Sequence, residues 1–595
     1  MAPSGQEPLL VNRAASPGSH EGGMEEDALL TGQRTHNNSK SITTRKQWRE
    51  IGLFVWALLA TAAVVVLAVV FQHSQAERSD SDGSRSGHPK GKRNLIFMVS
   101  DGMGPTSLSL TRSWRQYTED LPFDDQLVLD SLLIGQSRTR SSNSLVTDSA
   151  AGATAFSCGQ KSYNGAISVL PNHDPCGSVM EAAKMAGYTT GLVVTTRITD
   201  ATPAVFASHV RKREMEDEIA LQMVGETHPL GRMVDLIFGG GRCHFLPGNK
   251  DGSCRHDDTD VARIAQDNHN WTYVSSRGEF DKLGSQFDLP MLGLFATGDI
   301  PYEIDRRFVD DKYPSLDEMA TKALRALSAA TEDAEQGFFI MIEGSRIDHA
   351  GHANDAAAQV HEVLAYDRTI AVVLDFINKE AKVPTLMVST SDHETGGLAA
   401  ARQLHEAYPD YLWYPGVLAN ASHSSSWTSH QYHAHLQEQG QSQSKEDLKD
   451  YLVTLLDKSL GIVDPSSEEL LALIERKEVS PYIFAEMMSR RAQTGWSTHG
   501  HSAADVNIYT SDPHAAHALR GNHENTEVGE FLRSYLDVES EVMEVTQKLK
   551  DNLKVLGESW LGSVPLSDER LDGQDHLEKY HGDHKHKRAC DFCEM

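Results

Sequence analysis

The segment Asn94–Gly104, NLIFMVSDGMG, decides the fold of this chain. Its apolar run Leu95–Val99 is typical of a strand buried on both faces, and Asp101 follows where the run ends. Three later apolar runs are likewise followed by candidate metal ligands: Gly191–Thr195 by Asp200 and Thr202, Phe338–Ile342 by Glu343, Asp348 and His352, and Thr385–Ser389 by Asp392 and His393. Ligands of open α/β sheets bind outside the carboxyl ends of the strands. Four such strand ends therefore predict one polynuclear metal site.

Helical patterns lie between these strands. Two of them are Ser178–Gly187 and Ser315–Thr331, and the second begins with Ser315 and Glu318 at the spacing of a capping box. Such alternation predicts an α/β fold, a three-layer α/β/α sandwich around a large, mainly parallel sheet. We also expect one terminal helix over Thr526–Leu553.

The charge of the chain excludes one class of partner. The 595 residues include 55 basic and 84 acidic side chains, which gives a formal net charge of −29. Non-specific binding to nucleic acid requires a basic surface. We therefore expect no nucleic-acid partner.

Residues 51–71 carry no charge and predict an N-terminal transmembrane helix. As a helix they would span roughly 31 Å, which matches the core of a bilayer. The alternatives, a signal peptide or a buried core helix, fit less well because the stretch is long and follows a polar tail. Three basic residues lie at 45–50, whereas the first one after the stretch is Arg78, so the positive-inside rule predicts a cytoplasmic N-terminus. The glycosylation sequons at Asn270 and Asn420 then lie on the lumenal side.

The ends of the chain have the composition of disordered or flexible segments. Residues 1–50 predict a disordered cytoplasmic tail, and residues 72–93 predict a flexible stalk. Within the tail, Glu25, Leu29 and Leu30 form an acidic dileucine pattern of the kind that adaptor coats read. This pattern favours the vacuole membrane over the plasma membrane.

The cysteines agree with an oxidising compartment. Four of the six form two locally spaced pairs, Cys158 with Cys176 and Cys243 with Cys254. The second pair flanks a loop with glycine and proline, which suits a disulfide. Whether Cys158 pairs with Cys176 stays open at this point.

Ser149 is the candidate nucleophile. It lies in TDSAAGATA, Thr147–Ala155, where a run of small residues predicts the start of a helix capped by Asp148 or Ser149. Free N–H groups and the helix dipole at such a position suit a phosphate. An ordinary capping serine is the alternative. No GxSxG elbow surrounds Ser149, so a Ser-His-Asp hydrolase is not indicated.

Residue spacing and position along the sequence indicate further candidate metal ligands. Asp348 and His352 are four residues apart and would share one face of a helix. His501 precedes the short strand pattern Val506–Tyr509. Mixed histidine and carboxylate ligands suit Zn²⁺, whereas Asp, Thr and Glu oxygens suit Mg²⁺.

Six motifs, in the same order along the chain, resemble those of the alkaline phosphatase family: VSDGMG, TDSAAGATA, DATPAVFASHV, EGSRIDHAGH, TSDHETGG and HGHSAADV. The resemblance implies a large α/β/α sandwich with two Zn²⁺ and one Mg²⁺ per subunit, usually as a homodimer. The anchor and the dileucine pattern are most similar to the fungal vacuolar, type II membrane members. The implied catalytic domain spans residues 94–563, with an insertion at about 398–494. The tail 564–595 would then be a propeptide.

Motif by motif, the resemblance assigns roles to particular residues. Ser149 matches the nucleophile that becomes phosphorylated, and Arg213 matches the arginine that grips the phosphoryl oxygens. The implied metal ligands are Asp348, His352 and His501 for the first zinc, Asp101, Asp392 and His393 for the second zinc, and Thr202, Glu343 and the carboxylate of Asp200 for magnesium, which Asp101 also reaches. Arg211 and His499 are the competing choices for Arg213 and His501. His349 could reach phosphate through water.

The resulting hypothesis is a metal-dependent hydrolase that converts phosphate monoesters into an alcohol and phosphate through a phosphoserine intermediate. We expect a broad substrate range and a lumenal active site in the vacuole. A sulfatase would need a CxPxR segment, which the sequence lacks. A diesterase would be expected to lack one of the magnesium ligands or Arg213. A catalytically silent receptor would be expected to lack Ser149, Arg213 or a metal ligand. The sequence retains all of these residues, which argues against both alternatives.

Overall fold

The computed structural model describes residues 91–284, 286–439, 444–557 and 559–562, together with Trp56 and Thr61. The chain divides into two units, Met1–Ser86 and Gly87–Met595, and the account below concerns the second. The predicted cytoplasmic tail, the anchor apart from Trp56 and Thr61, nearly all of the stalk and the C-terminal tail lie outside the described residues. In the described part of the chain, no helix has the length and apolar character that a membrane span requires.

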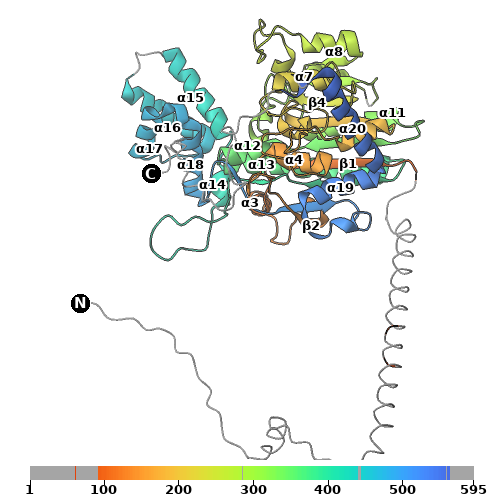
Figure 1. Ribbon diagram of the computed structural model, residues 1–595. Helices are drawn as coiled ribbons and strands as arrows, with labels where there is room; N and C mark the ends of the chain where they lie inside the picture. The colour runs from red at the N-terminus through yellow and green to blue at the C-terminus, as the bar shows by residue number, and fades with distance from the viewer. Residues whose placement is uncertain are drawn as a thin grey trace, which may run out of the picture. The chain divides into compact units, whose positions relative to one another are not determined.

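One large sheet forms the centre of the second unit (Figure 1). In the described residues it has ten strands, and only β11 runs antiparallel to its neighbours. In spatial order the strands are β12 Gly521–Glu524, β2 Leu133–Arg138, β11 Val506–Thr510, β8 Thr385–Thr390, β1 Asn94–Val99, β7 Phe338–Glu343, β3 Thr189–Arg197, β4 Leu236–Gly240, β6 Met291–Leu294 and β5 Thr272–Val274. The prediction of a mainly parallel sheet is confirmed.

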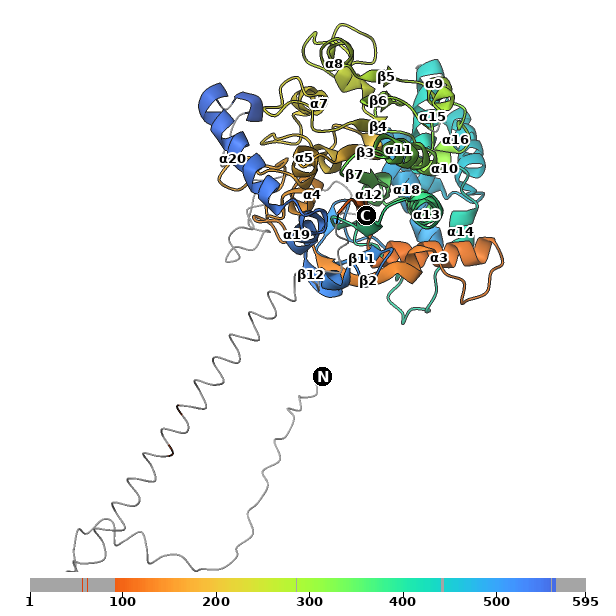
Figure 2. The same ribbon diagram turned by 90° about the vertical axis from the view of Figure 1, so that its right-hand side faces the viewer.

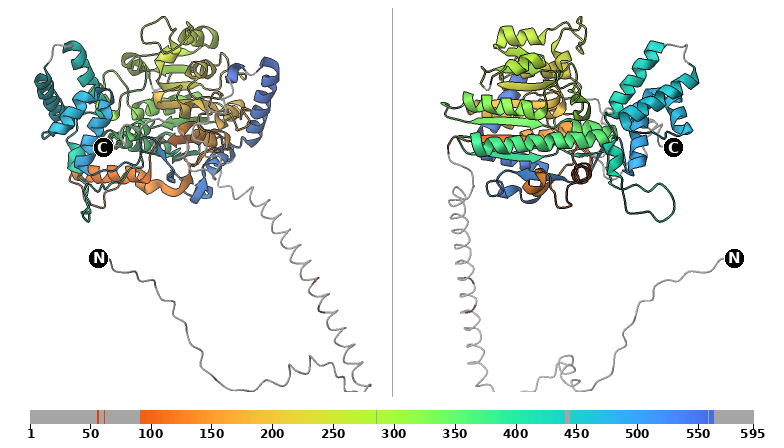
Figure 3. Two further views of the ribbon diagram at one scale, coloured as in Figure 1. Left: turned by 60° about the vertical axis from the view of Figure 1, so that its left-hand side comes forward. Right: turned by 180° about the vertical axis from the view of Figure 1, so that it is seen from behind.

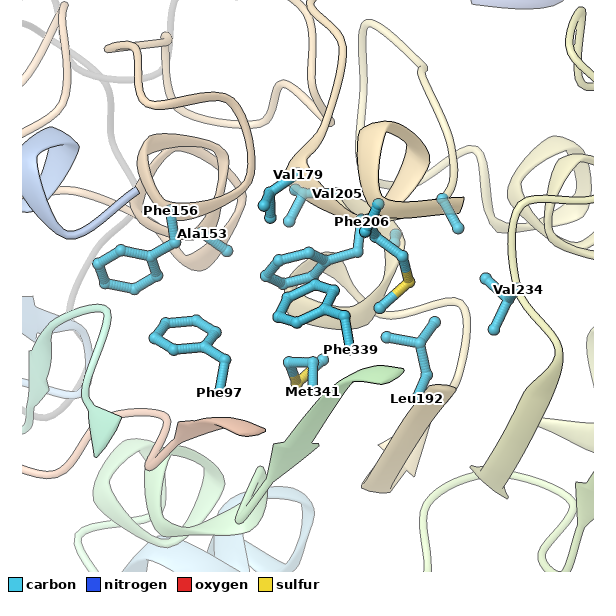
Figure 4. Close-up of a cluster of buried hydrophobic side chains, with 14 of the residues drawn as sticks. Phe97, Ala153, Phe156, Val179, Leu192, Val205, Phe206, Val234, Phe339 and Met341 are labelled. Atoms are coloured by element: carbon cyan, nitrogen blue, oxygen red, sulfur yellow. The ribbon is translucent and has the colours of Figure 1, made fainter. Parts of the chain in front are cut away.

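The central strands are buried on both faces, as their continuous apolar runs predict. Alternate residues of β1 point to opposite sides, so that Phe97 joins one hydrophobic cluster and Ile96 the other. Figure 4 shows Phe97 beside Phe156 and below Phe206 and Phe339, and the ring centroids of Phe97 and Phe156 are 5.4 Å apart. This contact attaches α4 to the middle of the sheet.

Helices cover both faces of the sheet (Figure 2). One layer contains α4 Ser149–Cys158, α5 Val179–Met185, α6 Ala201–Ala204, α7 Glu216–Val224, α8 Val261–His269, α19 Asn525–Leu536 and α20 Glu539–Leu556. The other layer contains α3 Pro105–Thr118, α9 Arg277–Lys282, α11 Leu316–Ala330 and α13 Ala356–Asp375. The chain therefore has the predicted three-layer architecture. Helix α11 starts at the predicted capping box of Ser315 and Glu318.

The region predicted as an insertion forms a helical group beside the sandwich, clearest in the right-hand view of Figure 3. Its helices are α14 Pro415–Ala419, α15 Ser425–Gln439, α16 Lys445–Leu460, α17 Ser467–Glu475 and α18 Ser480–Ala492. They share a separate hydrophobic cluster with the start of α13 and with Leu110 of α3. Two short helices, α10 Glu303–Arg306 and α12 Arg346–His352, follow β6 and β7 along the chain.

The structure contradicts one prediction about a helix and establishes two disulfide bonds. The single terminal helix expected over Thr526–Leu553 is wrong, because Asp537 takes a positive φ of 59° and separates α19 from α20. The predicted disulfide between Cys243 and Cys254 is confirmed, and Cys158 pairs with Cys176.

Candidate active site

Four neighbouring strands, β8, β1, β7 and β3, carry the candidate ligands at their carboxyl ends. The register pairs Val99 of β1 with Thr390 of β8 on one side and with Glu343 of β7 on the other. Asp101 and Asp392 each follow these paired residues by two positions, so the two carboxylates lie at the same height in the sheet, next to Glu343. Parallel register alone brings these three carboxylates together, although almost 300 positions separate the first from the last.

Gly102 makes this close approach feasible. It has a φ of +77°, and a Cβ atom at this position would lie 2.5 Å from the Cα atom of Asp348. Any larger residue would be strained and would push α12 away from the end of β1. The glycine of the SDG segment thus allows Asp101 and Asp348 to face one site.

Ser149 is the first residue of α4. Asp148 caps the helix by accepting a hydrogen bond from the Ala151 N–H at 3.0 Å, so Ser149 is free of that role. The Ser149 Oγ atom lies 3.1 Å from Nε2 of His393, and the residue is 3 % exposed. The serine hydroxyl therefore lies at a helix N-terminus and against one of the candidate ligands.

Asp348, His352 and His501 form one cluster. Nε2 of His352 lies 3.3 Å from Oδ2 of Asp348, and Nε2 of His501 lies 3.5 Å from Oδ1. The other ring nitrogen of each histidine bonds a backbone carbonyl, His352 that of His499 and His501 that of Thr147. A carbonyl accepts, so both Nδ1 atoms donate, and Nε2 is the nitrogen of each ring that can ligate a cation held beside Asp348.

A short ladder selects His501 over His499. β10 His501–Ser502 pairs with β9 Glu394–Thr395, with His501 opposite Thr395. The rings of His501 and His393 consequently stack with centroids 3.4 Å apart. His499 instead donates from Nδ1 to the carbonyl of His352 at 2.9 Å.

Asp101, Asp392 and His393 form a second cluster. Nε2 of His393 lies 3.2 Å from Oδ2 of Asp392 and 3.5 Å from Oδ1 of Asp101. Both of these carboxylate oxygens are buried, and within the described residues neither has a hydrogen-bond partner. Buried polar atoms without partners are rare and call for an explanation.

The oxygen ligands Asp200, Thr202 and Glu343 lie on the far side of Asp101. The Thr202 hydroxyl donates to Oδ2 of Asp101 at 3.4 Å and also interacts with Glu343. Oε2 of Glu343 is a third buried carboxylate oxygen that lacks a hydrogen-bond partner in the described part of the chain. Asp200 accepts at Oδ1 from Arg213 and at Oδ2 from Arg197.

The charges of the site do not balance by themselves. Burial, followed by the neighbouring carboxylates, raises the pKa of Asp101 well above its ordinary value, and burial and Asp200 do the same for Glu343. The pKa of Asp348 is lowered despite its burial, because His352 and His501 lie beside it. Cations bound beside these buried carboxylates would offset their mutual repulsion and favour their ionised forms.

The residues fit divalent metal ions. Two groups, one of Asp348, His352 and His501 and one of Asp101, Asp348 and His393, each have ligand atoms within 4.8 Å of one another. Mixed nitrogen and carboxylate ligands suit Zn²⁺. The hard oxygens around Thr202 and Glu343 suit Mg²⁺. The three unpartnered carboxylate oxygens are explained if they face metal ions.

Arg213, not Arg211, reaches the site. Nη2 of Arg213 donates to Oδ1 of Asp200 at 3.0 Å and Nη1 donates to Oδ2 of Asp148 at 3.3 Å. Its side chain is 28 % exposed and therefore not completely enclosed by its neighbours. Arg211 points the other way, towards the carbonyl oxygens of His173 and Gly562.

Sequence reasoning missed two supporting residues. Thr395 donates its hydroxyl to Oδ1 of Asp348 and lies 3.2 Å from Nδ1 of His393, so it orients ligands of both clusters. Its place two residues after His393, within the TSDHETGG motif, was the available signal. Arg197 contacts Asp200, Glu216 and Asp299 and so fixes the Asp200 carboxylate from behind. His349, considered as a contact to phosphate, lies with Nε2 3.9 Å from Oδ2 of Asp200.

A buried group of Glu181, His209 and His228 also resembles a metal site but has a different role. Oε1 of Glu181 lies 2.9 Å from Nε2 of His209 and 2.8 Å from Nε2 of His228. Nδ1 of His228 accepts from the Leu230 N–H, so its Nε2 carries the proton and cannot ligate a metal. The group is therefore a hydrogen-bonded network that stabilises the fold.

Comparison with known proteins gives a consistent result. The family model described as "Alkaline phosphatase" matches residues 92–538. The repressible alkaline phosphatase of Saccharomyces cerevisiae is 50 % identical over 516 residues, which cover 83 % of this chain and 89 % of the relative. The crystal structure of a cold-active alkaline phosphatase from Shewanella sp. is 30 % identical, with a TM-score of 0.61 over 74 % of this chain and 99 % of that one.

A third relative has a bound metal. It is a histidine-to-aspartate variant of the alkaline phosphatase from the Antarctic bacterium TAB5, with magnesium in the site named M3. It is 26 % identical, with a TM-score of 0.51 over 75 % of this chain and 99 % of that one. The family match, the identity to the yeast enzyme and the shared fold together show that this chain is a member of the alkaline phosphatase family of hydrolases.

Proposed function

We propose that this chain hydrolyses phosphate monoesters through a phosphoserine intermediate on Ser149, with two Zn²⁺ and one Mg²⁺ per subunit. Family membership supports the phosphomonoesterase activity itself. The observation that carries the mechanism is the position of the Ser149 hydroxyl, 3.1 Å from Nε2 of His393 at the N-terminus of α4. A phosphoryl group in front of it would also lie within reach of Arg213.

The residues of the site have separate tasks in the first half-reaction. The Ser149 oxygen attacks phosphorus and forms a new O–P bond, the bond between phosphorus and the substrate oxygen breaks, and in the net reaction the serine hydroxyl proton ends on the released alcohol. Arg213 has N–H groups beyond those bonded to Asp148 and Asp200, and it holds two equatorial oxygens of the phosphoryl group. The N-terminus of α4, with the positive end of its helix dipole, would stabilise the same charge.

In the second half-reaction a water molecule attacks the phosphoserine, and the O–P bond to Ser149 breaks. Phosphate leaves, and the serine hydroxyl is restored. Divalent metal ions held by the two histidine–carboxylate clusters would lower the pKa of the attacking hydroxyl and stabilise the leaving oxygen. Thr202, Glu343 and Asp200 would hold the magnesium ion. The magnesium in the TAB5 variant supports this part of the proposal.

The test combines activity with trapping of the intermediate. The purified protein is assayed with a chromogenic phosphate monoester before and after chelation, and again after zinc and magnesium are returned. Acid quenching during turnover should leave phosphate on the peptide that contains Ser149. Turnover without any phosphoserine would disprove the covalent mechanism, and hydrolysis of diesters in preference to monoesters would disprove the substrate class.

We propose further that the protein is a type II membrane protein of the vacuole, with residues 51–71 as the anchor. The uncharged stretch and the basic residues before it support this topology. Glu25, Leu29 and Leu30 would bind an adaptor coat. Replacing Leu29 and Leu30 with alanine should reroute the protein to another membrane, and unchanged localisation would disprove the sorting role.

Three properties of the mature protein complete this proposal. Asn270 and Asn420 are exposed at the ends of α8 and α14, so both can carry a glycan. Residues 564–595 would be a propeptide, and an intact Met595 in the mature protein would disprove its removal. We also propose a homodimer, which light scattering of the purified protein would test.

A further inference from the structure

The segment Ser559–Gly562, here named the C-terminal strap, lies across the loop that carries Arg213. Its backbone accepts three hydrogen bonds. Trp560 O accepts from Nε2 of Gln222 at 3.0 Å, Leu561 O accepts from the Arg211 N–H at 2.9 Å, and Gly562 O accepts from Nη1 of Arg211 at 2.9 Å. Two of the three bonds involve a residue only two positions from Arg213.

The strap is also packed against its surroundings. Leu561 is fully buried in a small hydrophobic cluster with Ala166 and Val169. The rings of Trp560 and His209 are nearly perpendicular, with centroids 6.1 Å apart. A Cβ atom on Gly562 would lie 2.2 Å from Sδ of Met215, so this end of the strap directly contacts the far end of the loop.

The loop between α6 and α7 is held in its conformation by hydrogen bonds to segments on two sides. On one side, Val210 exchanges two backbone hydrogen bonds with Ile167, and the Arg213 N–H donates to Gly165 O at 2.8 Å. On the other side, within the described residues, the backbone partner of Arg211 N–H is the strap. A loop held from two sides keeps its side chains in one orientation.

We propose that the C-terminal strap positions Arg213 for phosphate binding. The inference rests on the proposed role of Arg213 and extends it, since the strap touches neither substrate nor metal. Because the guanidinium must meet two phosphoryl oxygens at once, a small shift of its loop would weaken the grip. Through this loop, the C-terminal strap would influence how tightly substrate binds. Removal of the tail beyond Gly562 would leave the strap in place.

The main test is Leu561→Asp in the full-length, metal-loaded protein. A buried carboxylate should expel the strap from its cluster. The expected result is a rise of about tenfold in KM and in the inhibition constant for inorganic phosphate, with kcat/KM lower by about 10- to 100-fold. Val555→Asp is the matched control, because Val555 lies nearby at the end of α20 but is 80 % exposed. The control should keep wild-type kinetics.

A double-mutant cycle separates positioning from general destabilisation. If the strap acts through Arg213, Leu561→Asp should cause little further loss of kcat/KM in an Arg213→Ala background. Fully additive losses would overturn the proposal. Wild-type KM and phosphate inhibition in the single variant would overturn it too, whereas an inactive wild-type protein would instead refute the proposed function.

Hydrogen exchange provides a readout that does not depend on activity. Leu561→Asp should raise exchange in the peptide that spans Val210–Met215 and leave that of β1 unchanged. Unaltered exchange of the loop would overturn the proposal. Should Leu561→Asp fail to fold, Arg211→Met removes the 2.9 Å bond to Gly562 O together with the longer, 3.5 Å bond to His173 O, and it should raise KM with the same selective increase in exchange.

Discussion

The hydroxyl oxygen of Ser149 lies 3.1 Å from Nε2 of His393, although 244 positions separate the two residues. Ser149 begins α4 on one face of the sheet, and His393 follows the end of β8. The contact joins the candidate nucleophile to the candidate metal centre. It also defines which side of the serine a phosphoryl group can occupy, because His393 and its neighbouring carboxylates fill the other side.

Replacing Ser149 with alanine should remove activity while the metal site stays intact. We expect a loss of roughly a thousandfold or more in kcat, because the covalent route is closed. Metal content measured by elemental analysis should match that of the wild type. Ser157→Ala, on the same helix but bonded to Thr154 and Ser168, is the control and should keep activity. Equal activity of Ser149→Ala and wild type would contradict the assignment.

Replacing Arg213 with lysine should raise KM, although the positive charge remains. A lysine ammonium cannot hold two phosphoryl oxygens in a planar fork, and we expect kcat/KM to fall by roughly tenfold to a hundredfold. Steady-state kinetics and inhibition by phosphate would measure the effect. A lysine variant with unchanged phosphate inhibition would argue against bidentate binding.

His501 and His499 should behave differently when each is changed to alanine. His501→Ala removes an atom that faces Asp348 and should reduce the number of tightly bound metal ions. His499→Ala removes a hydrogen bond to the carbonyl of His352, which costs about 1 kcal/mol, and a ring contact with Tyr482, and should keep the full metal content. Equal metal loss in both variants would contradict the assignment of His501, rather than His499, as a metal ligand.

Removing metal ions should lower thermal stability as well as activity. Asp101, Asp392 and Glu343 each have a buried carboxylate oxygen without a hydrogen-bond partner among the described residues, and mutual repulsion is then uncompensated. Ligands that bind only the native state stabilise it by mass action. We expect chelation to lower Tm by several degrees, and re-addition of zinc and magnesium to restore it. An unchanged Tm after complete removal would contradict the proposed centre.

The network of Glu181, His209 and His228 should make stability depend on pH. Despite burial, Glu181 raises the pKa of His209 above its ordinary value of 6.5, and the two histidines lower that of Glu181 below 4.5. The His209 contribution is complete below pH 6.5 and is lost as the pH rises through the raised pKa. The Glu181 contribution is complete above pH 4.5 and is lost as the pH falls through the lowered pKa.

The pair should therefore stabilise the fold most between about pH 4.5 and 6.5. Glu181→Gln leaves a buried histidine without its counter-ion and should lower the free energy of unfolding by about 3–5 kcal/mol in this range. The difference from wild type should shrink at higher pH. Denaturant unfolding at a series of pH values measures it, and a constant difference up to pH 9 would contradict the ion pair.

Much of the fold could be predicted from local sequence patterns. The apolar runs of β1, β3, β7 and β8 are short, continuous and bounded by polar residues, so their burial in a parallel sheet could be predicted. The capping box of α11, formed by Ser315 and Glu318, likewise acts over only a few residues. The break between α19 and α20 could not be predicted, because Asp537 adopts its left-handed conformation in a stretch whose helical periodicity continues.

The sequence by itself determined which strand ends carry the candidate ligands and that a helix starts near Ser149, since both depend on neighbours in the chain. The resemblance of the motifs selected Arg213 over Arg211 and His501 over His499, but only the tertiary structure shows the contacts that distinguish them. One residue lies between the members of each pair, so their surroundings along the chain are nearly the same. The choice is made by distant partners, Asp148 and Asp200 for Arg213 and the β9–β10 ladder for His501, because a side chain's direction is set by what packs around its backbone.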